Sequence, residues 1–152
     1  MPTHHTGTVE EERVLNTFIK LTRAVDAYMA RVANHHPLGD LTLSQFGVLE
    51  AVYHLGPMSQ KDIGKKILKS GGNMTLVIDN LVKRGLVERN QAEYDRRVML
   101  ISLTPAGHAL IAEVFPRQLE ALVEEMRVLT PAEQEELARL CRKLGRGAEV
   151  AA

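Results

Sequence analysis

The sequence predicts a mainly α-helical fold of the α+β class, with a unit of short helices, a β-hairpin and long helices at both ends. Three observations support this fold class. Apolar residues recur at helical spacing through most of the 152-residue chain. The spacing becomes that of strands only in residues 86–103. The tripeptide Thr-Pro-Ala, which is typical of a helix start, then occurs at residues 104–106 and 130–132.

The composition is typical of a globular protein of the cytoplasm. Hydrophobic residues make up 45% of the chain and charged residues 25%, which indicates neither disorder nor a membrane span. The sequence does not start with a basic stretch followed by an apolar run, so we expect no signal peptide. The single cysteine, Cys141, excludes an intramolecular disulfide and suits a reducing compartment. We therefore expect a cytoplasmic protein without a membrane partner.

Charge is distributed unevenly along the chain, although the formal net charge is +0. Residues 59–104 carry 9 basic and 5 acidic side chains, a net charge of +4, whereas residues 1–58 and 105–152 each carry a net charge of −2. Local charge sets the electrostatic field at a binding surface. The basic middle third therefore favours an acidic partner such as nucleic acid.

A heptad pattern of apolar residues indicates the first long helix. The spacing is 4-3-4-3-4, at Val14, Phe18, Leu21, Val25, Tyr28 and Val32. Proline and glycine in "NHHPLGD", residues 34–40, end this helix. A single helix cannot bury such a stripe against itself, so we expect it to pack against partner helices.

Two short helices follow, each with a recognisable cap. Thr42 precedes the first of them, and Gln45 completes a capping box three residues later. Gly56 and Pro57 end that helix. Ser59 caps the second helix, which carries an acidic residue in its first turn.

A third helix, at about residues 71–84, precedes the hairpin. Its apolar residues lie at i, i+3, i+4 and i+7, at Met74, Val77, Ile78 and Leu81. Glycine at position 85 ends it. The segments "LVER" and "VMLISL" then alternate as two strands, which form a wing at about residues 86–103. Three helices followed by a hairpin are the plan of a winged helix-turn-helix.

Two helices that start at the Thr-Pro-Ala tripeptides complete the chain. Pro116 lies inside the first of them and is expected to kink or break it. The second starts with another capping box. We therefore expect a winged helix-turn-helix region at residues 37–104, flanked by helical regions at residues 1–36 and 105–152.

The start of the third helix carries residues typical of DNA recognition. A helix-turn-helix places the N-terminal end of its second helix in the major groove. Gly71 and Gly72 would let the backbone approach phosphate, and Ser70 would bind a phosphate oxygen. Asn73 is suited to a bidentate contact with adenine, and Thr75 to a thymine methyl. The alternative is a glycine-rich helix start without a function.

Leu76 and four lysines extend the predicted recognition surface. Leu76 lies off the apolar stripe, so we expect it to be exposed and to contact bases. Lys61 and Lys65, together with Lys66 and Lys69, lie on the preceding helix, where they would neutralise phosphates and make binding salt dependent. A solvated face is an equally good interpretation of these lysines.

The tip of the wing gives the most specific indication of function. Arg96 and Arg97 lie at the expected turn, directly after Asp95. A carboxylate can hold a guanidinium by two hydrogen bonds and so fix its orientation. An arginine held in this way suits the DNA minor groove, which is narrow and strongly negative. We therefore expect the wing to bind the DNA backbone and minor groove.

Residues 41–107 resemble the multiple-antibiotic-resistance regulator (MarR) family of bacterial transcription factors. The similarity is clearest in "SGGNMTLVIDNLVKRGLVER" and "DRRVMLISLTPAG". The family signature falls on Asp95, Arg97, Leu103, Thr104 and Gly107. The resemblance implies a homodimer on a pseudo-palindromic DNA operator, with Arg97, helped by Arg96, in the minor groove. The chain departs from the family at Leu76, where many members carry a basic residue.

The resemblance also implies a dimer interface built from the terminal helices, and an effector site. The interface residues would be Val14, Phe18, Leu21, Leu119, Leu122, Met126, Leu137, Cys141 and Leu144. Family members often bind small aromatic or phenolic effectors between the dimer helices and the DNA-binding lobe. The matching candidates are Tyr28, His35, His36, Phe46, Tyr53 and His54. Ordinary packing is the alternative role for each of these side chains.

We therefore expect a homodimeric, sequence-specific DNA-binding regulator, and in particular a repressor that a small effector releases. One alternative is a thiol-based redox switch at Cys141, which precedes two basic residues. Another is a winged helix that binds only proteins. The histidines lack the spacing of a zinc site, so no metal or cofactor is expected. Neither a nucleophile elbow nor a phosphate-binding loop is present, so we expect no enzyme.

Overall fold

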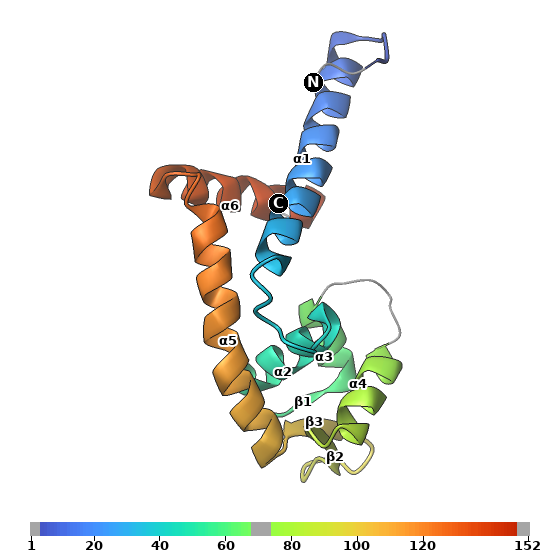
Figure 1. Ribbon diagram of the computed structural model, residues 1–152. Coiled ribbons are helices and arrows are strands. Elements are labelled where there is room, and N and C mark those ends of the chain that lie inside the picture. Colours follow the sequence, from blue (N-terminus) through green and yellow to red (C-terminus); the bar gives the residue numbers. More distant parts are fainter. Residues whose placement is uncertain (1–3, 68–73, 149–152) are drawn as a thin grey trace. The chain divides into compact units, whose positions relative to one another are not determined.

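The computed structural model describes residues 4–67 and 74–148 and confirms the expected fold class (Figure 1). The helices and strands follow one another as α1 (Val9–Ala33), α2 (Leu43–Leu55), β1 (Met58–Ser59), α3 (Gln60–Ile67), α4 (Met74–Lys83), β2 (Val87–Gln91), β3 (Met99–Leu103), α5 (Pro105–Met126) and α6 (Pro131–Arg146). None of the helices in the described stretches has both the length and the apolar character that a membrane crossing requires.

The chain divides into two compact units, which are described separately. The winged-helix unit comprises residues 36–119. The helical unit comprises the residues before 36 and after 119. The sequence predicted that the winged-helix unit ends at residue 104. The unit ends later, inside α5, because Ile111 and Val114 of α5 are buried in its core.

The sheet of the winged-helix unit has three strands, one more than the sequence analysis predicted. β2 and β3 form the expected antiparallel hairpin, in which Val87 pairs with Leu103. β1 pairs with the other edge of β3, with Met58 opposite Ile101. A strand of two residues has no alternating pattern, so its partner strand alone identifies it.

Apolar side chains from α2, α3, α4, β3 and α5 form the core of the winged-helix unit. The largest fully buried side chains include Leu49, Ile63, Ile78, Leu81, Ile101 and Ile111. Ile78 and Leu81 both belong to α4, and their burial turns one face of this helix towards the core. The opposite face of α4 is therefore left at the surface.

Gly107, in the first turn of α5, packs against the turn between α4 and β2. A Cβ atom at this position would lie 1.9 Å from the backbone oxygen of Leu86, so a larger residue would have to displace the backbone. Thr104 adds two hydrogen bonds at the same point. Its Oγ1 donates to the Gly85 oxygen at 2.6 Å, and its backbone N–H donates to the Leu86 oxygen at 3.1 Å. These contacts give Thr104 and Gly107 a structural role.

α5 runs from Pro105 to Met126 without an interruption. Of the two outcomes expected at Pro116, the break is therefore wrong, and the kink stays a prediction. Pro116 is exposed to solvent. A proline inside a helix removes one backbone hydrogen bond, and at this position the helix continues in spite of that loss.

The helical unit consists of α1, the end of α5, and α6. α1 begins earlier than its apolar pattern indicates, because Thr8 and Glu11 form a reciprocal capping box. The expected capping box of α6 is present. Large apolar side chains of α1 and α6 remain exposed, namely Val14, Phe18, Val25, Leu137, Leu140 and Leu144. The heptad stripe of α1 is therefore only partly covered within one chain.

Candidate nucleic-acid interface

The exposed face of α4 presents Thr75 and Leu76 to solvent. Leu76 is 53% exposed, as expected from its position off the apolar stripe. Lys61 and Lys65 are exposed on α3, which packs against α4. Lys66 is exposed on α3 as well. The remaining predicted contacts of this region lie outside the described residues: Lys69, Ser70, Gly71, Gly72 and Asn73. The assignment of DNA contacts to α3 and α4 therefore stays a prediction.

Polar contacts fix α4 to its neighbours. Gln60, the first residue of α3, donates from Nε2 to the Thr75 Oγ1 at 2.8 Å. Asp79 of α4 forms an ion pair with Arg89 of β2. Neither contact was predictable from the sequence, because the partners lie 15 and 10 residues apart on different elements. Only the arrangement of α3, α4 and the wing brings these side chains together.

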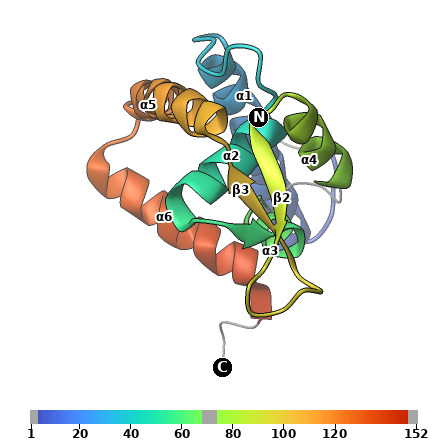
Figure 2. The ribbon, with the colours of Figure 1, turned by 90° about the horizontal axis from the view of Figure 1, so that it is seen from below.

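The loop between β2 and β3 forms the tip of the wing (Figure 2). In this loop, Asp95 holds the Arg97 side chain in a fixed arrangement. The Arg97 Nε donates to Asp95 Oδ1 and the Nη2 to Asp95 Oδ2, both at 3.1 Å. The backbone N–H of Arg97 also donates to Asp95 Oδ1, at 2.9 Å. The Arg97 side chain nevertheless remains 90% exposed. The geometry is that of the fixed, outward arginine that the sequence analysis expected.

Hydrogen bonds from the Arg97 side chain and backbone lower the pKa of the Asp95 carboxyl group. The carboxylate form is therefore the one that the loop favours. Arg96, the neighbouring residue, is also exposed. The wing thus presents two guanidinium groups, of which Arg97 is held by the carboxylate of Asp95.

The predicted effector residues are divided between the two units. The helical unit contains Tyr28 and His35, and the remainder belong to the winged-helix unit. Phe46 is only 7% exposed and forms part of the core, which favours the packing role over an effector contact. His36 is exposed, with a backbone φ of 51°.

An aromatic cluster joins α2 to α5 in the winged-helix unit. Tyr53 and His54 are adjacent on α2, with ring centroids 5.1 Å apart. The Tyr53 ring lies 5.2 Å from the His108 ring, and the His54 ring lies 4.6 Å from the Phe115 ring. All three pairs meet edge to face. Tyr53 and His54 are among the residues that the sequence predicted to bind an effector. Their ring partners on α5, His108 and Phe115, are added to these candidates.

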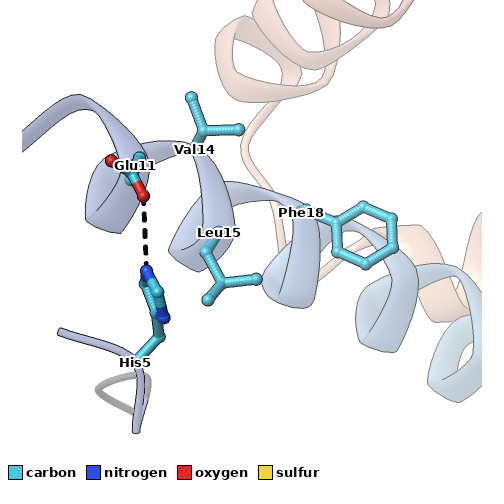
Figure 3. A pocket seen from close by; sticks show the side chains of 5 residues that line it. All are labelled: His5, Glu11, Val14, Leu15 and Phe18. Atoms are coloured by element: carbon cyan, nitrogen blue, oxygen red, sulfur yellow. Dashed lines mark hydrogen bonds and ion pairs between the residues drawn. The ribbon is translucent and has the colours of Figure 1, made fainter. Parts of the chain in front are cut away.

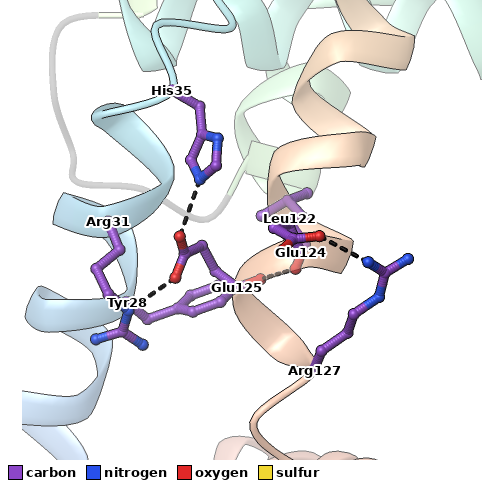
Figure 4. A network of polar contacts seen from close by, with 7 residues as sticks. All are labelled: Tyr28, Arg31, His35, Leu122, Glu124, Glu125 and Arg127. Atoms are coloured by element: carbon purple, nitrogen blue, oxygen red, sulfur yellow. Dashed lines mark hydrogen bonds and ion pairs between the residues drawn. The ribbon is translucent and has the colours of Figure 1, made fainter.

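A polar network joins α1 to α5 in the helical unit (Figure 4). The Tyr28 hydroxyl donates to the backbone oxygen of Leu122 at 2.8 Å. Glu125 lies between two basic partners: Arg31 donates to it at 3.0 Å, and the His35 Nε2 lies 2.9 Å from its other oxygen. The pKa of Glu125 is lowered, mainly because of the hydrogen bond with His35. Tyr28 and His35 thus have structural partners on the same turn of α5.

Two open grooves lie in the helical unit. One of about 530 Å³ follows the start of α1 and is lined by His5, Glu11, Val14, Leu15 and Phe18 (Figure 3). The other, of about 410 Å³, lies between α1, the end of α5 and α6, and includes Tyr28 and Cys141 in its lining. Cys141 is exposed. Both grooves are mainly apolar and include residues that were assigned to the dimer interface.

Metal-binding side chains do not gather in the described part of the chain. Within residues 4–67 and 74–148, no group of three or more histidine, cysteine, aspartate or glutamate side chains is arranged to hold a metal ion.

The chain is similar to known transcription regulators. Residues 41–99 match the model of the MarR family. The HTH-type transcriptional regulator MhqR of Bacillus subtilis is 32% identical over 138 residues, which cover 91% of this chain and 95% of that protein. The matched family and this relative are transcription regulators and not enzymes, in agreement with the expectation from the sequence.

Solved structures show the same fold. A structure that describes how 6-hydroxynicotinic acid regulates the DNA binding of Bordetella bronchiseptica BpsR is 29% identical, with a TM-score of 0.77, and the match covers 97% of this chain and 99% of that chain. A mutant of E. coli MarR in complex with operator DNA is 27% identical, with a TM-score of 0.71, and the match covers 85% of this chain and 96% of that chain.

The Glu125 network predicts a pH-dependent contribution to stability. Because the folded state lowers the pKa of Glu125, its contacts stabilise the fold above the pKa of glutamate in the unfolded chain. This contribution is lost as the pH falls through the lowered, folded-state pKa. Glu125→Gln should therefore lower the urea midpoint at neutral pH, and the difference from the wild type should vanish in acid.

The exposed Glu120, on the same helix, provides the control. Glu120→Gln should leave the urea midpoint close to that of the wild type at each pH. A difference between Glu125→Gln and the wild type that stayed constant down to strongly acidic pH would contradict the role of the ionised carboxylate.

Proposed function

The chain belongs to the MarR family of DNA-binding transcription regulators, and from this premise we propose that it is a homodimeric repressor released by a small aromatic effector. The observation that carries the proposal is the Arg97 side chain, which Asp95 holds by two hydrogen bonds while it remains almost fully exposed. The proposed partners are a pseudo-palindromic DNA operator, a second copy of the chain and the effector. The proposed location is the cytoplasm.

The fixed guanidinium at the wing tip is suited to the minor groove of DNA. Two of the donor nitrogens of Arg97, Nε and Nη2, are used by Asp95. The third nitrogen, Nη1, forms no hydrogen bond to the described residues, and its N–H groups are therefore available to acceptors on DNA. The minor groove concentrates negative potential in a narrow passage, which favours an arginine that is already extended.

The recognition helix would enter the neighbouring major groove. α4 presents Thr75 and Leu76 on its exposed face, and Lys61 and Lys65 of α3 are placed to neutralise phosphates. In a twofold dimer, two such helices would read half-sites about 34 Å apart, one turn of the duplex. The crystal structure of a related regulator, a mutant of E. coli MarR, in complex with operator DNA supports the proposal that this fold binds DNA.

The exposed apolar side chains of α1, α5 and α6 support the proposed dimer. Val14 and Phe18 of α1 are each 58% exposed, and Leu119 of α5 is 47% exposed. Leu144, on α6, is 66% exposed. Exposed apolar patches of this kind mark surfaces that associate. A second copy that covers them would place two winged-helix units on one operator.

A small aromatic effector would act by favouring one state of the dimer. The similarity to BpsR, whose DNA binding 6-hydroxynicotinic acid regulates, supports a hydroxylated aromatic acid as the class of effector. The cluster of Tyr53, His54, His108 and Phe115 offers aromatic surface with polar tips. The effector can shift the dimer only by the difference between its affinities for the DNA-binding and the released state.

Two other functions are the alternatives, and an observation favours the first of them, a redox switch. Cys141 is exposed and borders the groove between α1, α5 and α6, so its oxidation would act on the proposed dimer interface. The second alternative, a winged helix that binds only proteins, would not require the arrangement at Arg97. Measuring affinity for duplex DNA at two salt concentrations separates a DNA-binding regulator from this second alternative, because phosphate contacts are lost steeply as salt rises.

Replacing Arg97 tests the DNA-binding surface directly. Arg97→Ala should weaken operator binding by about 1–3 kcal/mol, because the minor-groove contact is lost, and should leave the chain folded. Arg127→Ala is the matched control, since Arg127 is also an exposed arginine with an acidic partner. Fluorescence anisotropy with a labelled operator measures both affinities. Unchanged binding by a folded Arg97→Ala variant would contradict the proposed role of the wing.

Replacing Phe18 tests the proposed dimer interface. Phe18→Asp should convert the dimer to monomers, because a carboxylate would be buried without a partner between the two chains. Leu55→Asp is the control, since Leu55 is also 58% exposed but belongs to α2. Sedimentation velocity gives the mass of each variant. If the Phe18→Asp variant has the mass of a dimer, as the Leu55→Asp variant is expected to have, the interface lies elsewhere.

A further inference from the structure

A single hydrogen bond connects α3 to the exposed face of α4. Gln60 is half-buried at the start of α3, and its Nε2 donates to the Oγ1 of Thr75 at 2.8 Å. Thr75 is exposed and lies in the first turn of the described part of α4. Residues near the N-terminal end of a recognition helix are those that reach base edges. The bond therefore constrains a side chain on the proposed reading surface.

The direction of this hydrogen bond sets the chemistry that Thr75 can offer. A threonine hydroxyl has one proton to donate and two lone pairs that accept. The Gln60 N–H occupies one lone pair, so the hydroxyl proton cannot point at Gln60. Within the described part of the chain, the Thr75 hydroxyl has no acceptor. Among the described residues, therefore, nothing takes up its proton, which leaves the proton for an acceptor on DNA in the proposed complex.

We propose that Gln60 is a positioning residue that presets Thr75 as a hydrogen-bond donor to a base edge. This inference rests on the proposed function, in which α4 enters the major groove. The acceptors that face a donor there are N7 of either purine, O6 of guanine and O4 of thymine. Cytosine presents only its N4 amino group, which is a donor. The half-site position opposite Thr75 should therefore disfavour cytosine on the contacted strand.

Changing Gln60 to glutamate reverses the hydrogen bond without changing the size of the side chain. A carboxylate can only accept, so the Thr75 hydroxyl would donate to it and offer only its lone pairs to DNA. The preference at that one position should then move towards bases with an amino group, cytosine among them. The added negative charge should weaken binding to all duplexes alike, and so should not alter the ratio between bases.

The test is selection of bound sequences from a library of random duplexes by the purified full-length chain. The wild type should disfavour cytosine at one position of each half-site by roughly three- to tenfold, the range that one net hydrogen bond supplies. Thr75→Val should abolish this preference and Thr75→Ser should retain it. Gln60→Glu should reverse it at the same position, and Gln60→Ala should weaken it. Thermal unfolding of each variant confirms that the chain remains folded.

The possible outcomes separate this inference from the function on which it rests. If the wild type selects no sequence at all, the proposed function fails. If the wild type selects an operator but Thr75→Val leaves every preference unchanged, Thr75 does not read a base and the inference is overturned. It is also overturned if Thr75→Val changes one position while the Gln60 variants change none, or change a different one.

Discussion

The interaction on which the functional account depends is the hold of Asp95 on Arg97. An exposed ion pair of this kind contributes little to folding, typically about 0–1 kcal/mol, and Arg97 is 90% exposed. Stability therefore does not explain why the loop should fix this side chain by its backbone and by two side-chain hydrogen bonds. An arginine that is fixed before it meets its ligand loses less conformational entropy on binding. The pair is better explained as preparation for DNA than as a support for the fold.

The rest of the winged-helix unit joins the wing to α4, the proposed recognition helix. The buried Ile78 and Leu81 turn one face of α4 inwards and leave the other face at the surface. Arg89 of β2 holds Asp79 of α4, so the wing and the helix are joined by an ion pair as well as by the chain. Gly107 then allows α5 to approach the turn that precedes β2. These contacts thus hold α4 and the wing together within the winged-helix unit.

The sequence predicted those features that depend on neighbouring residues. Capping boxes, glycine stops and apolar spacing act within a few residues, so the helices that start at Leu43 and Pro131 were predicted correctly. The Asp95–Arg97 contact was predictable for the same reason, since its partners are two residues apart. β1 was not predicted, because its two residues become a strand only where β3 offers a free edge. The contact between Gln60 and Thr75 and the network around Glu125 were also missed, because they join different elements. Predicted contacts at residues 70–73 lie outside the described chain.

The most direct test of the central claim is the effect of Asp95→Asn on operator affinity. The substitution removes a negative charge from a loop that faces DNA in the proposed complex, so simple electrostatics predicts tighter binding. Our account predicts weaker binding, because the guanidinium loses its charged partner and must be ordered by DNA itself. Glu93→Gln, at an exposed acidic residue in the same loop, supplies the electrostatic reference and should bind slightly more tightly than the wild type. If Asp95→Asn binds as tightly as Glu93→Gln across a range of salt concentrations, the account is contradicted.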